Sequence, residues 1–156
     1  MLAQHLVRQG HIEAALFVGC IHYFGQGASI DYPRAMAAYK VGAEGGAALC
    51  QWQVGFMYFQ GLGVAADFKE ARPWIEKAAA QNVPTAVAQL GAMYSNGQGV
   101  TPSWRRAREL WARAIELGHS KSVTYLQEIN EEDIPEVCPG MAIIPSSHVH
   151  QNASRH

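Results

Sequence analysis

The chain has 156 residues, of which 49% are hydrophobic and 16% are charged, and its formal net charge is −1. A chain of this length can bury one core, and its apolar content is too high for a disordered polyampholyte. The balanced charge argues against a nucleic-acid partner, because binding to a phosphate backbone depends on an excess of Lys and Arg.

The start of the sequence reads as part of a helix rather than as a targeting segment. The first residues, MLAQHLVRQGHIEAALF, place Arg8, His11 and Glu13 where a signal peptide needs an uninterrupted apolar stretch. No run of about 18 apolar residues, the length of a membrane-spanning helix, follows anywhere in the sequence. We therefore expect a cytoplasmic protein without membrane contact, unless an N-terminal segment has been lost from the chain.

The most informative feature of the sequence is a period of 36 residues. Glycines recur at this interval, both singly and as Gly-x-Gly pairs, and small or helix-ending residues keep the same phase. A constant period of about 20–50 residues is typical of a solenoid of stacked structural units. The positions in register are Gly19, Gly55 and Gly91; the pairs Gly25 and Gly27, Gly61 and Gly63, and Gly97 and Gly99; Ala35, Ala71 and Ala107; and Gly10, Gly46, Asn82 and Gly118.

Each unit is expected to contain two helices, A and B. Apolar residues at helical spacing mark helix A, which ends in the Gly-x-Gly turn. Helix B begins after Asp31, Asp67 or Ser103, whose side-chain oxygens can accept hydrogen bonds from the free N–H groups of the first turn. In chain order the expected helices are B 2–9, A 11–24, B 32–45, A 47–60, B 68–81, A 83–96, B 103–117 and A 119–130.

These helices divide the chain into a row of units and predict an all-α fold, an α/α superhelix of antiparallel helix pairs. Residues 1–10 form a partial N-terminal helix, equal to half a repeat, and full repeats follow at 11–46, 47–82 and 83–118. Residues 119–130 repeat helix A with Gln127 in the position of Gly91, as expected of a capping helix. Residues 131–156 break the period, and we expect them to be extended or disordered.

Two segments, VGFMYFQGLGVAADFKEARPWIEKAAAQN and LGAMYSNGQGVTPSWRRARELWARAIELG, carry the pattern A…LG..Y..G.GV..D...A..W..KAA. In this pattern the chain resembles the Sel-one-like repeat family, relatives of the tetratricopeptide repeat, over about residues 11–118. His22 replaces the tyrosine of the pattern in the first repeat, and the third repeat lacks the aspartate. The resemblance implies a right-handed solenoid whose A helices line a concave wall. It also implies a bacterial scaffold or adaptor in signalling, envelope or host-interaction assemblies.

The concave wall is the predicted binding surface. Counting 100° per residue from the repeated LG glycine places one set of side chains opposite the core positions. Aromatic residues are unexpected on a solvated face, so we predict an apolar groove for a partner peptide whose backbone is hydrogen-bonded by Gln and Asn side chains. The alternative interpretation is that packing between repeats covers the aromatic rings. The predicted partner-binding residues are Phe17, Cys20, Phe24, Gln53, Phe56, Gln60, Gln89, Asn96 and Tyr125.

The tail supplies a second hypothesis about binding. Residues 141–145, MAIIP, form a short apolar segment. This segment is a candidate for docking onto the chain's own groove or onto the exposed side of the last helix, and an inert tail is the alternative.

Catalysis, cofactors and metals are not expected. The chain has an odd number of cysteines, Cys20, Cys50 and Cys138, and none of them has CxxC spacing. This argues against a disulfide framework or a zinc site. The Gly-x-Gly turns lack the GK[ST] of a phosphate loop. The resemblance leaves one alternative, a small hydrolase or β-lactam-binding protein of the cysteine-rich branch of the family. The chain lacks the paired cysteines of that branch and an SxxK motif.

Overall fold

The computed structural model describes residues 11–128, and within this range all regular structure is helical. The first six described helices agree with the expected ones to within one residue at each end. The helix expected at 2–9 and the tail at 131–156 lie outside the described residues. The helices are α2 (Ile12–Phe24), α3 (Tyr32–Glu44), α4 (Ala48–Gln60), α5 (Phe68–Ala80), α6 (Pro84–Asn96), α7 (Trp104–Glu116) and α8 (Lys121–Gln127).

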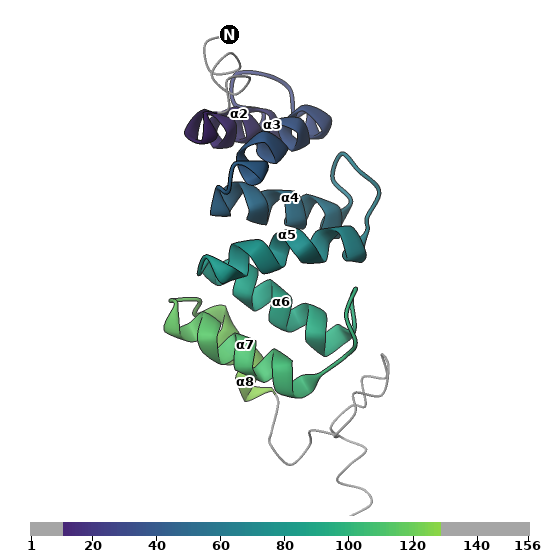
Figure 1. Cartoon of the computed structure of the whole chain (residues 1–156), viewed down its shortest axis with the longest axis vertical. Coiled ribbons are helices and arrows are strands. Elements are labelled where there is room, and N and C mark those ends of the chain that lie inside the picture. Colours follow the sequence, from purple (N-terminus) through teal and green to yellow (C-terminus); the bar gives the residue numbers. More distant parts are fainter. Residues whose placement is uncertain (1–10, 129–156) are drawn as a thin grey trace, which may run out of the picture.

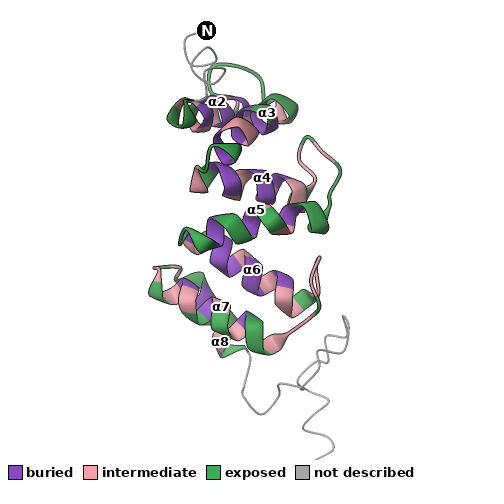
Figure 2. Cartoon of the chain, in the orientation of Figure 1, coloured by how far each residue is buried: buried purple, intermediate pink, exposed green. Residues whose placement is uncertain are grey.

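The helices form pairs that stack in a row (Figure 1). α2 packs on α3, α4 on α5 and α6 on α7, and the second helix of each pair also packs on the first helix of the next. α8 packs on α7 at the end of the row. Buried residues lie where helices face one another, and exposed residues lie on the outer sides (Figure 2). The predicted α/α superhelix is therefore confirmed. None of the described helices is both long and apolar enough to cross a membrane.

Side-chain caps and left-handed residues set the helix ends. Asp67 accepts hydrogen bonds from the backbone N–H groups of Lys69 and Glu70, at 2.9 and 3.1 Å, and so satisfies two donors that the helix leaves unpaired. Asp31 and Ser103 cap α3 and α7 in the same way. The A helices each end at a glycine with a left-handed backbone, whose φ is 69° at Gly25, 73° at Gly61 and 66° at Gly97.

The glycine in the middle of each A helix lets the paired B helix approach closely. A Cβ atom on Gly55 would lie 2.6 Å from the side chain of Ile75, and one on Gly91 would lie 2.6 Å from the indole of Trp111. Trp111 is 5% exposed, and its indole N–H donates a hydrogen bond to the carbonyl oxygen of Ala88 at 3.1 Å. These contacts explain why glycine recurs every 36 residues opposite a large residue on helix B.

In the second and third Gly-x-Gly turns, the second glycine lies against the preceding unit. A Cβ atom on Gly63 would lie 2.7 Å from the backbone carbonyl carbon of Tyr32, and one on Gly99 would lie 2.7 Å from the carbonyl oxygen of Phe68. Tyr32 and Phe68 begin the second helix of the preceding pair. Because these glycines have no side chain, each turn can rest directly on the start of that helix. The turns therefore join neighbouring units as well as ending their own helices.

Candidate functional site

The first helices of the pairs, α2, α4 and α6, present a common side to solvent, which we call the A-helix face. Its most exposed apolar side chains are Phe17 and Phe24, each 58% exposed, and Leu49, 52% exposed. The surface contains all of the sequence-predicted binding residues on these helices, together with their neighbours on the same side. The A-helix face consists of Glu13, Phe17, Cys20 and Phe24 on α2; Leu49, Gln53, Phe56 and Gln60 on α4; and Thr85, Gln89, Ala92 and Asn96 on α6.

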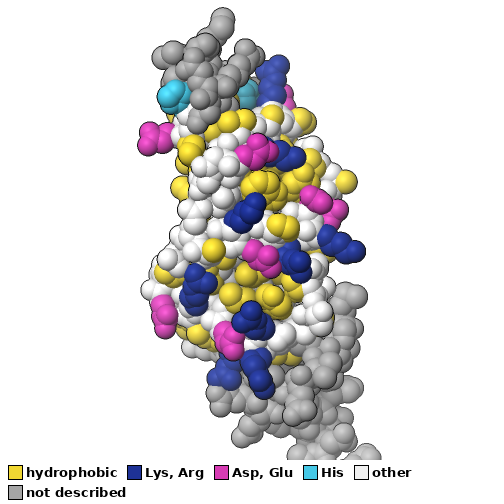
Figure 3. Space-filling view, in the orientation of Figure 1, with side chains coloured by type: hydrophobic (Ala, Val, Ile, Leu, Met, Phe, Trp, Pro, Cys, Tyr) yellow, Lys and Arg dark blue, Asp and Glu magenta, His cyan; other side chains and the backbone are white. Residues whose placement is uncertain are grey.

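The A-helix face carries almost no charge. α4 and α6 contain no Lys, Arg, Asp or Glu, and Glu13 is the one such residue of α2. The charged side chains of the helix pairs lie instead on α3, α5 and α7. Figure 3 shows acidic and basic side chains spread along the stack with hydrophobic side chains gathered between them. The two kinds of helix therefore offer different chemistry, one uncharged and one with mixed charge.

The polarity of the A-helix face changes along the row of repeats. The position of Phe17 is taken by Gln53 and then Gln89, and that of Phe24 by Gln60 and then Asn96. Aromatic side chains therefore dominate at α2, and side-chain amides dominate at α6. Packing between repeats leaves Phe17 and Phe24 more than half exposed.

Four of the predicted residues also make contacts inside the protein. The ring centroid of Phe24 lies 4.8 Å from that of the partly buried Tyr23. Phe56 is partly buried, with its ring centroid 5.4 Å from that of Trp52. Cys20 is partly buried, and its sulfur accepts a hydrogen bond from the hydroxyl of Tyr39 at 3.5 Å. Tyr125 lies on α8 with its ring 5.3 Å from the buried Trp111, and it remains 38% exposed. The sequence placed these residues on an accessible side but did not indicate their contacts with the core.

The buried groups behind Cys20 stay neutral in the folded protein. Burial raises the pKa of the Cys50 thiol from its ordinary value of 9.0 to about 11, and the nearby Cys20 adds to the effect. Burial and the hydrogen bond to Cys20 also raise the pKa of the Tyr39 hydroxyl. Cys50 and Tyr39 are both fully buried. These groups therefore act as parts of the core and not as ionised nucleophiles near neutral pH.

We expect the free energy of unfolding to fall as the pH rises above about 9, because the unfolded chain then ionises Cys50 while the folded chain keeps it protonated. The contribution of the thiol to the free energy of unfolding is complete below the pKa that the thiol has in the unfolded chain. It is lost as the pH rises to about 11. Urea unfolding monitored by circular dichroism across this range measures the effect. Cys50→Ala should reduce the pH dependence, and Ala14 and Ala86 at the equivalent positions indicate that alanine fits there. An unchanged pH dependence in this variant would show that the thiol does not contribute.

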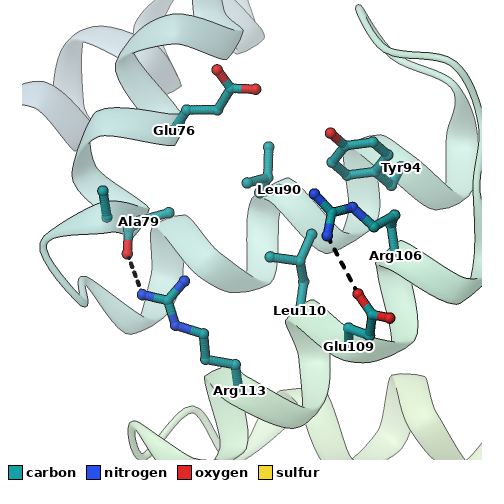
Figure 4. A pocket seen from close by; sticks show the side chains of 9 residues that line it. Glu76, Ala79, Leu90, Tyr94, Arg106, Glu109, Leu110 and Arg113 are labelled. Atoms are coloured by element: carbon teal, nitrogen blue, oxygen red, sulfur yellow. Dashed lines mark hydrogen bonds and ion pairs between the residues drawn. The ribbon is translucent and has the colours of Figure 1, made fainter.

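A pocket that the sequence analysis did not anticipate lies between α5, α6 and α7, with a volume of about 430 Å³. We call it the α5–α7 pocket. Figure 4 shows Leu90 and Leu110 in its middle, Glu76 on the α5 side, Arg106 and Glu109 at one end and Arg113 at the other. The sequence contains one indication of this pocket. Leu110 is at the position that the larger Trp74 has one repeat earlier. Its lining residues are Glu76, Ala79, Ala80, Leu90, Tyr94, Arg106, Glu109, Leu110 and Arg113.

The charged groups of the α5–α7 pocket are held by neighbours. Arg113 donates hydrogen bonds to the carbonyl oxygen of Ala79 at 2.8 Å and to the side chain of Asn82 at 2.7 Å. Arg106 pairs with Glu109 at 3.4 Å. Among residues 11–128, no three His, Cys, Asp or Glu side chains come together as a metal site would require.

The comparisons with known proteins agree with this architecture. The model of the Sel1 repeat matches residues 12–46, 48–83 and 84–119. Among curated proteins, none matches the chain in sequence. A protective antigen of uropathogenic Escherichia coli strains, which displays an SLR fold, is 30% identical over 85% of this chain with a TM-score of 0.80. This chain covers 28% of the length of that protein.

Two further solved structures are similar. A Sel1 repeat protein from Oxalobacter formigenes is 28% identical over 81% of this chain, with a TM-score of 0.73 and 96% of its own length covered. Cysteine-rich protein B of Helicobacter pylori is 17% identical over 80% of this chain, with a TM-score of 0.63 and 94% of its own length covered. At this level of identity the last similarity shows the fold alone.

Proposed function

Because the chain belongs to the Sel1 repeat family, we propose that it is a non-catalytic scaffold or adaptor that binds a partner protein or peptide along the A-helix face. Repeats of this family are associated with protein partners in general. The observation that carries the proposal is the pair of exposed rings, Phe17 and Phe24, on a face that is almost free of charge. Large apolar side chains left in solvent, side by side with amides, are typical of surfaces that bind another protein.

The chemistry of the A-helix face favours an uncharged, partly apolar partner segment. The aromatic end at α2 and α4 would anchor large apolar side chains. The amides of Gln53, Gln60 and Gln89 would donate to and accept from the backbone of an extended peptide, since each amide carries both kinds of group. Binding of this kind depends little on salt, because screening acts on charges and the face offers almost none.

The test uses peptides selected from a displayed random library against the full chain. The affinity of a selected peptide is then measured by calorimetry for the wild type and for the double variant Phe17→Ala with Phe56→Ala. We expect the double variant to bind about 30-fold more weakly or worse, because truncating aromatic anchors typically removes about 2 kcal/mol of binding free energy or more. Circular dichroism checks that the fold survives.

Phe68→Ala is the matched control, since Phe68 is an exposed phenylalanine on α5, outside the A-helix face. It should bind the peptide as the wild type does. Equal binding by the folded double variant and the wild type would contradict the proposed face.

A further inference from the structure

The α5–α7 pocket has a counterpart one repeat earlier, between α3, α4 and α5. Subtracting the repeat length of 36 pairs Tyr94 with Tyr58, Leu90 with Val54 and Leu110 with Trp74. The floor and one wall of the two sites are therefore similar. Among these three pairs the largest difference is the last, where a leucine replaces an indole. The charged rim also differs, because Arg106 and Glu109 stand where Glu70 and Pro73 stand in the earlier unit.

In the earlier site, the chain's own side chains contact one another at the equivalent positions. Trp74 packs against the buried cluster formed by α3 and α4. The amino group of Lys77 lies 4.5 Å from the centre of the Trp74 ring. The amino group of Lys40 donates a hydrogen bond to the hydroxyl of Tyr58 at 2.9 Å. The combination of an aromatic ring and neighbouring cations stabilises this site.

In the later site two of these groups are replaced, whereas Arg113 keeps a cation at the position of Lys77. Leu110 lacks the ring of Trp74, and Glu76 stands where Lys40 stands in the earlier unit. Glu76 pairs with Arg72 on its own helix at 3.6 Å rather than with the tyrosine. The volume of about 430 Å³ is within the range of small-ligand sites, although the pocket is open to solvent.

The lining specifies the chemistry of an occupant. The bottom is apolar, formed by Leu90 and Leu110, and two glutamates and two arginines around it balance in charge. Arg106 lies over the ring of Tyr94, 6.0 Å from its centre, so its planar group is oriented for aromatic contact. Arg113 is held in place by hydrogen bonds to two neutral acceptors. The equal numbers of glutamates and arginines in the lining favour an uncharged ligand. The lining therefore complements a flat, uncharged ring.

We propose that the α5–α7 pocket binds an uncharged aromatic side chain of indole size from a partner polypeptide, in the position that Trp74 fills within the preceding site. This contact is separate from the A-helix face, because it involves Leu90 and Tyr94 of α6 and not the side that carries Gln89 and Asn96. A partner that engages both surfaces would hold the third repeat from two sides.

The test titrates the full chain with the uncharged probe N-acetyl-5-fluorotryptophan amide and follows the fluorine resonance by NMR. We expect saturable binding to the wild type. Leu110→Trp, which copies the side chain of the earlier unit, should weaken binding at least tenfold. Trp74→Leu should open the earlier site and raise the number of probes bound per chain from one to two. Circular dichroism verifies the fold of both variants.

The outcomes separate this site from the A-helix face. The double variant Phe17→Ala with Phe56→Ala should bind the probe as the wild type does, whatever its effect on peptide binding. Failure of the wild type to bind, or equal binding by folded Leu110→Trp, would overturn the proposal. Tighter binding of the anionic probe N-acetyl-5-fluorotryptophan would also overturn it, because the pocket would then select a carboxylate.

Discussion

Replacing Trp111 by Ala is expected to lower the free energy of unfolding by about 3–5 kcal/mol, the usual effect of truncating a large buried aromatic residue. Trp111 is 5% exposed and belongs to a buried cluster that joins α5, α6 and α7. Its removal leaves a cavity beside Gly91 and takes away the donor to the carbonyl oxygen of Ala88. Tyr125 of α8 also loses the ring on which it packs.

Chemical unfolding followed by circular dichroism measures this effect. Trp74→Ala is the matched control, because Trp74 is also a tryptophan on the second helix of a pair but is only partly buried. Its cost should be less than half that of Trp111→Ala. Equal costs for the two variants would contradict the assignment of Trp111 to the buried core.

Replacing Gly91 by Ala is expected to lower the free energy of unfolding by about 2 kcal/mol, although alanine favours a helix more than glycine does. The added Cβ atom would lie 2.6 Å from the indole nitrogen and 2.7 Å from Cδ1 of Trp111. The indole is a rigid ring held by its own hydrogen bond, so either the ring or the helix must move. Steric overlap therefore outweighs the gain in helix propensity.

A double-mutant cycle tests this explanation with the same unfolding measurement. With Trp111→Ala already present, adding Gly91→Ala should have little further effect, because the atoms that it would overlap are gone. Gln127→Ala, at the equivalent position of α8, should change stability by less than about 0.5 kcal/mol, since Gln127 is exposed. Additive costs for Gly91→Ala and Trp111→Ala would show that the overlap is not the cause.

The helix pairs could be predicted from the sequence because the residues that begin and end each helix recur in all three repeats. Asp31, Asp67 and Ser103 cap the B helices, and glycines with positive φ end the A helices, as expected. These are local interactions, so the residue types alone locate them. The glycines opposite Ile75 and Trp111 are long-range contacts, but their constant spacing made them visible.

The contacts of the candidate sites could not be predicted from the sequence, because a projection of one helix does not show how neighbouring helices pack against it. Counting residues around an A helix identified the side on which Phe17 and Phe24 lie exposed. It could not show that Cys20 contacts Tyr39, because that contact depends on the rotation of α3 against α2. The 36-residue period does not indicate the α5–α7 pocket, because the period consists of residues that the units share, and the pocket lies where they differ, with Leu110 in the place of Trp74.

The contacts of Gly63 and Gly99 with the helix starts of the preceding units bear on how proteins of this architecture can evolve in length. Both junctions place a glycine against the first residue of a helix, so a gene duplication of 36 codons would insert a module whose two boundaries are already compatible with its neighbours. A single-residue insertion at such a junction would instead displace the turn from the helix it rests on. Growth and shrinkage by whole modules is therefore the evolutionary path that this geometry tolerates.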